Sequence, residues 1–272
     1  GVYFFGASNL KWALRTWELP ADERARVGNY GIGAINHAFE LQFLRFLVEQ
    51  RGLGRKGDSR TTVVVGAFWG NALDFPAESY FAPLWRRHGL YTYDPATGIA
   101  DAPLGPVARQ YRVEKARCAG LIGGNMNRVA RAVALGLGQP LDPTERMKDP
   151  AEVRAWILAH WGNLGWSDAT AGQVRALAEL LDYLTARRIG VRIALLPRRA
   201  AFDEVPLDPA YREAVTALAA AKNVPLTDLS SLLTEDDYWD INHYNARGLE
   251  KTNAALMAIA RDELGRDLPG RD

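Results

Sequence analysis

The segment Thr61-Thr62-Val63-Val64-Val65-Gly66-Ala67-Phe68 decides the fold class of this chain. It is almost entirely apolar and rich in β-branched residues, which favour strands. A strand with one face in water alternates apolar and polar residues, whereas a strand covered on both faces reads as a continuous apolar run. We therefore expect a central strand in a parallel sheet that has helices on both faces.

Other short apolar runs alternate with helical patterns along the chain. We expect four further strands, at residues 2–5, 27–32, 191–196 and 224–229. Apolar residues at helical spacing predict helices between residues 10 and 17, from 35 to 52, from 173 to 188 and from 249 to 264. This order predicts an α/β domain with a five-stranded, mostly parallel sheet.

A long segment after the third strand fits no simple crossover, because it far exceeds the usual loop length. Helical patterns occupy residues 77–87, 107–121, 127–137 and 152–160. We expect residues 75–166 to form a helical cap inserted into a single domain that spans 1–272. A separate second domain is the alternative, although no Pro/Ser-rich linker flanks the segment.

Charge and cysteine content exclude several kinds of partner. The 33 basic and 32 acidic residues give a net charge of +1, so we expect no nucleic-acid partner. Cys118 is the only cysteine, which rules out an internal disulfide and a cysteine-based zinc site. No apolar stretch reaches the roughly 18 to 20 residues of a membrane helix. The abrupt start on a strand-like run is consistent with a signal or anchor upstream of this sequence.

Residues suited to catalysis stand where strands end, and ligands of open parallel sheets bind beyond the carboxyl ends of the strands. Ser8 follows the first strand and enters a helix. The other candidates, in chain order, are Gly31 and Gly33 after the second strand, Trp69, Gly70 and Asn71 after the third, and Asp240 and His243 before the last helix.

Ser8, His243 and Asp240 fit the roles of a catalytic triad. A serine hydroxyl needs a base to take its proton, and histidine titrates in the right range. An acid three residues earlier in the chain can hold the histidine in the required tautomer. The candidate donors to an oxyanion are the N–H groups of Ser8 and Gly33 and the side-chain amide of Asn71.

This ordered set resembles the SGNH (GDSL-like) hydrolase superfamily. Gly6-Ala7-Ser8-Asn9 is similar to its first block, Asn29-Tyr30-Gly31-Ile32-Gly33 to its second, and Asp240-Ile241-Asn242-His243-Tyr244-Asn245 to its last. The resemblance covers the chain apart from the insertion. It implies a flavodoxin-like three-layer α/β/α sandwich that hydrolyses or transfers acyl groups without a metal or other cofactor.

Two blocks depart from the family pattern. Ala7 replaces the usual Asp before the nucleophile, and Trp69-Gly70-Asn71-Ala72 replaces Gly-x-Asn-Asp. Such altered blocks resemble the branch that acts on cell-envelope polysaccharides, including alginate-type O-acetyltransferases and the D-alanylation protein of teichoic acids. This narrower resemblance implies an acylated carbohydrate or polysaccharide as substrate. It also implies a periplasmic or envelope location, with the cytoplasm as the alternative, and a membrane-bound partner reached through an upstream segment.

Each candidate residue also has a purely structural interpretation. Ser8 can be a helix N-cap, Asp240 and His243 a capping pair, and Asn71 a turn residue. Trp69 and Trp239 suit a sugar-binding surface but tryptophans are more often core residues. The remaining histidines have no partner pattern and are interpreted as structural or surface residues: His37, His88 and His160.

The sequence leaves one alternative to an acyl-transfer enzyme and argues against two others. A catalytically inactive SGNH-like domain that binds glycans or scaffolds an envelope complex remains the alternative. A dinucleotide site is rejected, because the sequence from Gly31 to Asn36 lacks the third glycine of that fingerprint. An α/β-hydrolase is disfavoured, because the chain has no Gly-x-Ser-x-Gly elbow.

Overall fold

The structure is a computed structural model that describes residues 1–31, 35–54, 61–73, 91–94, 98–108, 110 and 149–266. The chain divides into two compact units. The first consists of Gly1–Phe75 and Pro150–Asp272, and the second of Pro76–Asp149. All the residues of the sheet and of the candidate triad belong to the first unit.

The first unit contains a parallel five-stranded sheet with the order β2-β1-β3-β6-β7. Its strands are β1 (Val2–Gly6), β2 (Val27–Gly31), β3 (Thr62–Ala67), β6 (Gly190–Leu195) and β7 (Leu226–Asp228). The chain moves from β1 to β2 on one side and then to β3 on the other. The order therefore reverses between β1 and β3, where ligands of open α/β sheets bind beyond the strand ends.

Strand β3 is the central strand, as its uninterrupted apolar sequence predicts. All six of its residues are buried. It pairs with β1 on one side, in the register that aligns Gly6 with Gly66, and with β6 on the other. A strand between two neighbours and beneath helices on both faces has no contact with water, so an alternating pattern is absent.

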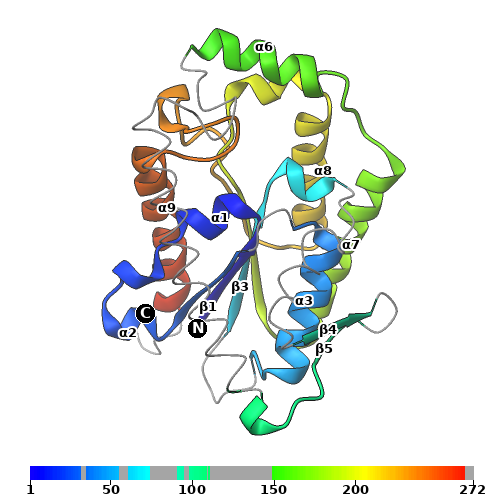
Figure 1. Ribbon diagram of the computed structural model, residues 1–272, viewed down its shortest axis with the longest axis vertical. Helices are drawn as coiled ribbons and strands as arrows, with labels where there is room; N and C mark the ends of the chain where they lie inside the picture. The colour runs from blue at the N-terminus through cyan, green and yellow to red at the C-terminus, as the bar shows by residue number, and fades with distance from the viewer. Residues whose placement is uncertain are drawn as a thin grey trace. The chain divides into compact units, whose positions relative to one another are not determined.

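Helices cover both faces of this sheet (Figure 1). On one face, α1 (Ser8–Ala13) contacts α9 (Ala246–Gly265); on the other, α7 (Asp168–Ala186) contacts both α3 (His37–Gln50) and α8 (Leu207–Ala221). The described part of the first unit is thus an α/β/α sandwich with the flavodoxin-like strand order, as expected. Short helical elements complete it: η1 (Thr16–Glu18), α2 (Ala21–Arg24), η2 (Trp69–Ala72), η4 (Ala200–Glu204) and η5 (Glu235–Asp237).

Two helices differ from the sequence expectation. Helix α1 ends at Ala13, earlier than the apolar spacing indicates, because Leu14 turns to an extended conformation. The Asn29 side chain donates to the carbonyls of Lys11 at 3.2 Å and Leu14 at 2.8 Å, which satisfies two groups at this helix end. Helix α8 was not predicted, although Leu207, Tyr211, Val215 and Ala219 recur at i, i+4 spacing and are buried.

The inserted segment contains more than helices. In the second unit, β4 (Tyr91–Asp94) pairs antiparallel with β5 (Gly98–Asp101), a hairpin that was not predicted and that lies between the helical patterns at 77–87 and 107–121. The helix predicted at 152–160 is present as α6 (Pro150–Trp161) and belongs to the first unit. The patterns at 77–87 and 127–137, and most of that at 107–121, lie outside the described residues.

The described residues also bear on membrane and metal binding. No helix in these ranges combines the length and apolar character needed to cross a membrane. Within the same ranges, no group of three or more His, Cys, Asp or Glu side chains is arranged to hold a metal ion.

Candidate active site

Ser8 begins α1 immediately after β1, at the switch point of the sheet. Its position depends on a close approach between α1 and the end of β2. A Cβ atom at Gly31 would lie 2.6 Å from the backbone N and Cα atoms of Lys11, so only glycine allows α1 to pack there. The serine hydroxyl is thereby held beyond the carboxyl edge of the sheet.

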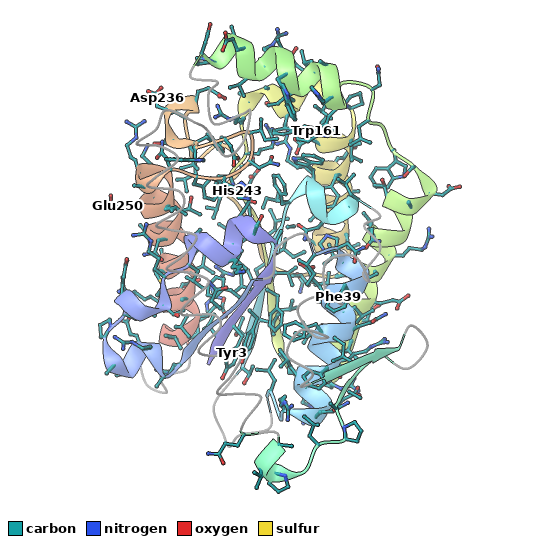
Figure 2. All side chains as sticks on the ribbon, in the orientation of Figure 1. Tyr3, Phe39, Trp161, Asp236, His243 and Glu250 are labelled. Carbon is teal, nitrogen blue, oxygen red and sulfur yellow. The ribbon has the colours of Figure 1, made fainter. Side chains whose placement is uncertain are left out.

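The hydroxyl of Ser8 contacts the ring of His243, although 235 residues separate the two in sequence. The Ser8 Oγ to His243 Nε2 distance is 3.2 Å. On the other side of the ring, His243 Nδ1 lies 2.8 Å from Asp240 Oδ2. Figure 2 shows His243 close to the start of α1. The three sequence candidates therefore form one continuous chain of contacts.

The loop between η5 and α9 carries Asp240 and His243, and its two sides are paired. Tyr238 and Tyr244 form an antiparallel bridge, and the Trp239 N–H donates to the His243 carbonyl at 2.8 Å. Asp240 Oδ1 accepts from the backbone N–H groups of Asn242 at 2.8 Å and His243 at 2.7 Å. The acid is thus fixed by its own turn, which leaves Oδ2 for the histidine ring.

Electrostatics favour an ionised Asp240. Burial favours the neutral carboxyl, but the hydrogen bond and charge of His243 and the two backbone N–H groups outweigh it and lower the pKa of Asp240. The ionised Oδ2 can only accept a hydrogen bond, so the Nδ1–H of His243 donates to it. When the ring is neutral, Nε2 then presents a lone pair to Ser8. The His243 side chain is 45% exposed, which leaves the ring accessible to a substrate.

Asn9 and Tyr244 join the serine segment to the histidine loop, a role that sequence reasoning did not assign. Asn9 Nδ2 donates to the Asn242 carbonyl at 3.0 Å and to the Tyr244 hydroxyl at 3.5 Å. The Tyr244 hydroxyl in turn donates to the Pro197 carbonyl at 2.9 Å. Both side chains are buried. Asn9 lies in the same sequence block as Ser8, and Tyr244 in the same block as His243. Their presence in these blocks was the only sign in the sequence of a role at the site.

Asn71 does not serve as an oxyanion donor in this structure, which corrects the sequence expectation. Its side chain is fully buried, and its amide donates to the Ile35 carbonyl at 2.9 Å and to Glu40 Oε1 at 3.2 Å. Its Oδ1 accepts from the Phe68 N–H at 2.9 Å. Both amide hydrogens are therefore engaged, and Asn71 joins η2 to the start of α3.

His37 belongs to the same buried network as Asn71, in agreement with its structural interpretation. Its Nδ1 lies 2.7 Å from Glu40 Oε2 and its Nε2 lies 2.6 Å from the Tyr211 hydroxyl. Burial raises the pKa of Tyr211, and the Glu40 and Asp208 charges add to this effect. The phenol therefore keeps its proton within its hydrogen-bonded contact with His37.

The remaining sequence candidates have different outcomes. Trp69 is 3% exposed and packs against the rings of Phe68, Trp161 and Phe202, so it is a core residue and not a surface for sugars. Trp239 is 38% exposed and directly precedes Asp240. Gly33 lies outside the described residues. Of the proposed oxyanion donors, the Ser8 N–H is in the first turn of α1, where N–H groups lack a helical acceptor.

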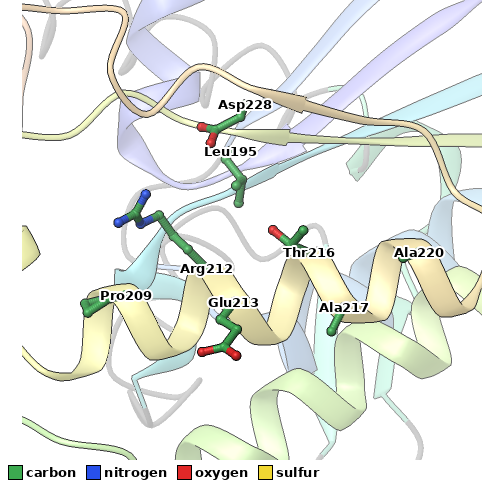
Figure 3. Close-up of a pocket in the computed structure, with 8 residues that line it drawn as sticks. All are labelled: Leu195, Pro209, Arg212, Glu213, Thr216, Ala217, Ala220 and Asp228. Carbon is green, nitrogen blue, oxygen red and sulfur yellow. The ribbon is translucent and has the colours of Figure 1, made fainter.

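A separate hollow of about 450 Å³ lies between α8 and the ends of β6 and β7 (Figure 3). It is lined by Leu195, Pro209, Arg212, Glu213, Thr216, Ala217, Ala220 and Asp228. Arg212 is already paired with Asp203 and Asp208, at 2.8 and 3.2 Å. Ser8, His243 and Asp240 do not line this hollow, so it is separate from the candidate site.

Comparisons with known proteins show only distant similarity. No protein-family model and no curated protein sequence matches the chain. Among solved structures, a chain from Bacteroides fragilis assigned as an acylhydrolase aligns at 12% identity and a TM-score of 0.44, covering 97% of this chain and 87% of its own.

Two further solved structures align equally distantly, each at 12% identity and a TM-score of 0.44. A GDSL-like lipase from Bacteroides thetaiotaomicron covers 96% of this chain and 87% of its own. The alignment with an acetyl xylan esterase covers 95% of this chain and 98% of the esterase chain. Similarity at 12% identity and a TM-score of 0.44 does not establish a function for this chain.

Proposed function

We propose that this protein is a serine-dependent acyl-ester hydrolase or O-acyltransferase that forms an acyl-enzyme on Ser8. One observation carries the proposal: the contacts from Ser8 Oγ to His243 Nε2 at 3.2 Å and from His243 Nδ1 to Asp240 at 2.8 Å. Nucleophile, base and orienting acid are the three parts needed to activate a hydroxyl near neutral pH.

The reaction follows from this order of proton donors and acceptors. Ser8 Oγ attacks the ester carbonyl carbon while His243 Nε2 takes the hydroxyl proton. The tetrahedral intermediate carries its negative charge on the former carbonyl oxygen, towards which the Ser8 N–H is the described donor. His243 then returns the proton to the leaving alcohol oxygen. Water or a second hydroxyl attacks the acyl-enzyme in the same way and releases Ser8.

We further propose an acylated carbohydrate as substrate, from a cell-envelope or exported polysaccharide. The half-exposed ring of Trp239, adjacent to Asp240, suits a contact with a sugar face. The resemblance of the altered sequence blocks to envelope enzymes supports the same substrate class. A periplasmic or envelope location, a membrane-bound partner, and a role of residues 75–166 in substrate choice belong to this proposal.

A fluorophosphonate that esterifies activated serines, combined with aryl acetate turnover, tests the proposal. Ser8→Ala and His243→Ala should each lower kcat by roughly 10⁴- to 10⁶-fold, and the double variant should be little worse than either alone because triad members act as a unit. Mass spectrometry should place the phosphonyl group on Ser8.

Ser167→Ala is the matched control, because Ser167 also stands at a helix N-terminus but caps α7 by accepting from the Thr170 N–H. It should lose about 1 kcal/mol of stability and keep its activity. Equal turnover by wild type and Ser8→Ala would contradict the nucleophile assignment. A folded wild type that is inert to phosphonate would instead favour the glycan-binding or scaffold alternative.

A further inference from the structure

Arg199 is a buried arginine at the carboxyl end of the sheet, four residues after β6 ends. Only 4% of its surface is exposed. A buried guanidinium is costly unless its charge is paired and its N–H groups are bonded. The partners of Arg199 are therefore informative about what this residue does.

Those partners all come from η5 and from the loop after it, which carries Asp240. The Nε and Nη2 groups of Arg199 donate to the Asp240 carbonyl oxygen at 3.1 and 3.0 Å. Its Nη1 group is paired with the Glu235 carboxylate and lies 3.5 Å from the Glu235 carbonyl oxygen. The guanidinium carbon also lies 4.7 Å from the centre of the Tyr238 ring. The guanidinium thus contacts both η5, at Glu235, and the loop that follows it, at Tyr238 and Asp240.

We propose that Arg199 is a positioning residue for the triad, which fixes the Asp240 backbone and thereby sets the orientation of its carboxylate towards His243. The inference rests on the proposed function for its catalytic consequence. Two donors on one carbonyl oxygen define both the position and the direction of that peptide group. The adjoining carboxylate then needs little further ordering to meet the histidine ring.

The contribution of Arg199 is geometric. Its charge is neutralised by Glu235, and it bonds the carbonyl of Asp240 and not the carboxylate. A lysine would keep one positive charge for Glu235, but a compact ammonium on a flexible stem cannot replace the planar fork that spans Glu235 and Asp240. Arg199→Lys should therefore give an intermediate defect, and Arg199→Ala a larger one.

The matched control is Arg192, another buried arginine of the same β6 region. It is 9% exposed and pairs with Asp262 and Glu263 of α9 at 3.0 and 3.1 Å, at the opposite end of the strand. Arg192→Ala removes a buried guanidinium without touching the loop. It should lower the melting temperature and leave kcat at the wild-type level.

The test uses the full chain and two readouts. The first is the far-downfield proton resonance of His243 Nδ1–H, which reports the bond to Asp240 whether or not the protein turns over a substrate. It should be lost or shifted in Arg199→Ala and intact in Arg192→Ala. The second is kcat for an aryl acetate, which should fall by up to roughly 100-fold with little change in KM, because a misplaced acid impairs the chemical step.

Methylguanidine at millimolar concentration should partly restore kcat in Arg199→Ala, but not in Arg192→Ala. An unchanged resonance and rate in Arg199→Ala would overturn the inference. If Arg199→Ala does not fold, Arg199→Lys provides the test. A wild-type resonance and kcat in Arg199→Lys would reject the positioning role, whereas an altered resonance with a lowered kcat would support it. A wild type that shows the resonance without turnover would contradict the proposed function alone.

Discussion

At the scale of single residues, Asp240 uses its two carboxylate oxygens for different tasks. Oδ1 accepts from two backbone N–H groups, whereas Oδ2 faces His243 Nδ1 at 2.8 Å. In Asp240→Asn, the amide oxygen must take the Oδ1 position to keep the backbone bonds. The NH₂ group then faces the histidine, which forces the ring proton onto Nε2 and removes the base for Ser8.

We therefore predict that Asp240→Asn folds normally but lowers kcat for an aryl acetate by roughly 10⁴-fold. The control is Asp236→Asn, because the Asp236 side chain is 82% exposed and pairs only loosely with Arg247, at 3.7 Å. That variant should be fully active. Full activity in Asp240→Asn would show that the tautomer of His243 is not set by this acid.

The limits of sequence reasoning are also visible at this scale. The contacts of Ser8, His243 and Asp240 were predictable, because the carboxyl ends of parallel strands meet at one edge of the sheet. Asn71 was misassigned, because sequence does not reveal that its amide turns inward to Ile35 and Glu40. Arg199 was missed for a related reason: its partners lie 36 and 41 residues away along the chain.

At the scale of elements, the strands were easier to predict than the helices. A continuous apolar run indicates a buried strand. The predicted bounds of β3 differ from the observed ones by one residue at each end. Helix α8 was missed although its buried residues recur at i, i+4 spacing, because Pro206 and Pro209 flank its first residues and are typical of a loop. The strands of the β4–β5 hairpin have only four residues each, too few for a clear pattern, so they were not predicted within the inserted segment.

The start of α9 is held to η5 through Asp237, whose side chain is buried. Its carboxylate accepts from the Thr234 N–H at 2.9 Å, from Lys251 at 2.7 Å and from Arg247 at 2.5 Å. Burial favours the neutral carboxyl, but the bonds from Lys251, Thr234 and Arg247 outweigh it and lower the pKa of Asp237 well below its usual value. The loop that carries the triad acid thus depends on an ionised group.

This lowered pKa predicts how stability depends on pH. A carboxyl that binds protons more weakly in the folded state stabilises the fold above its unfolded pKa, near 4, and that contribution is lost as pH falls towards its folded pKa. We expect the free energy of unfolding, measured in urea, to fall below about pH 4. Asp237→Asn should be roughly 1–3 kcal/mol less stable at pH 7, and its free energy of unfolding should depend less steeply on pH. An unchanged slope would contradict the assignment.

Gly248 provides a steric test of the same junction. A Cβ atom there would lie 2.2 Å from the Asp237 carbonyl oxygen, a backbone atom that cannot move aside cheaply. Gly248→Ala should cost about 1–3 kcal/mol and slow phosphonate labelling of Ser8, because the displaced loop carries Asp240 and His243. Gly265→Ala, at the open end of the same helix, has no atom within 4 Å of its Cβ and should be neutral or slightly stabilising.

At the scale of the whole molecule, the choice between hydrolysis and transfer depends on what occupies the site after acylation. In the proposed function both reactions share an acyl-enzyme on Ser8 and differ only in whether water or a sugar hydroxyl attacks it. Transfer requires a site that holds the acceptor at high effective concentration and limits water. Ser8, His243 and Asp240 all belong to the first unit, so under the proposed function we expect acylation itself to proceed without the second unit, Pro76–Asp149.

We therefore predict that the second unit controls the fate of the acyl group and not its formation. Acyl-enzyme made from an activated acetate ester and offered oligosaccharides in water should yield acetylated sugar in proportion to acceptor concentration, as detected by mass spectrometry. Replacing residues 76–149 with a short Gly/Ser linker should preserve phosphonate labelling of Ser8 while shifting the products towards free acetate. Free acetate alone from the full chain, across a panel of envelope glycans, would make the protein an esterase. Transfer that is unaffected by the deletion would place acceptor recognition in the first unit, with the half-exposed Trp239 as the next residue to substitute.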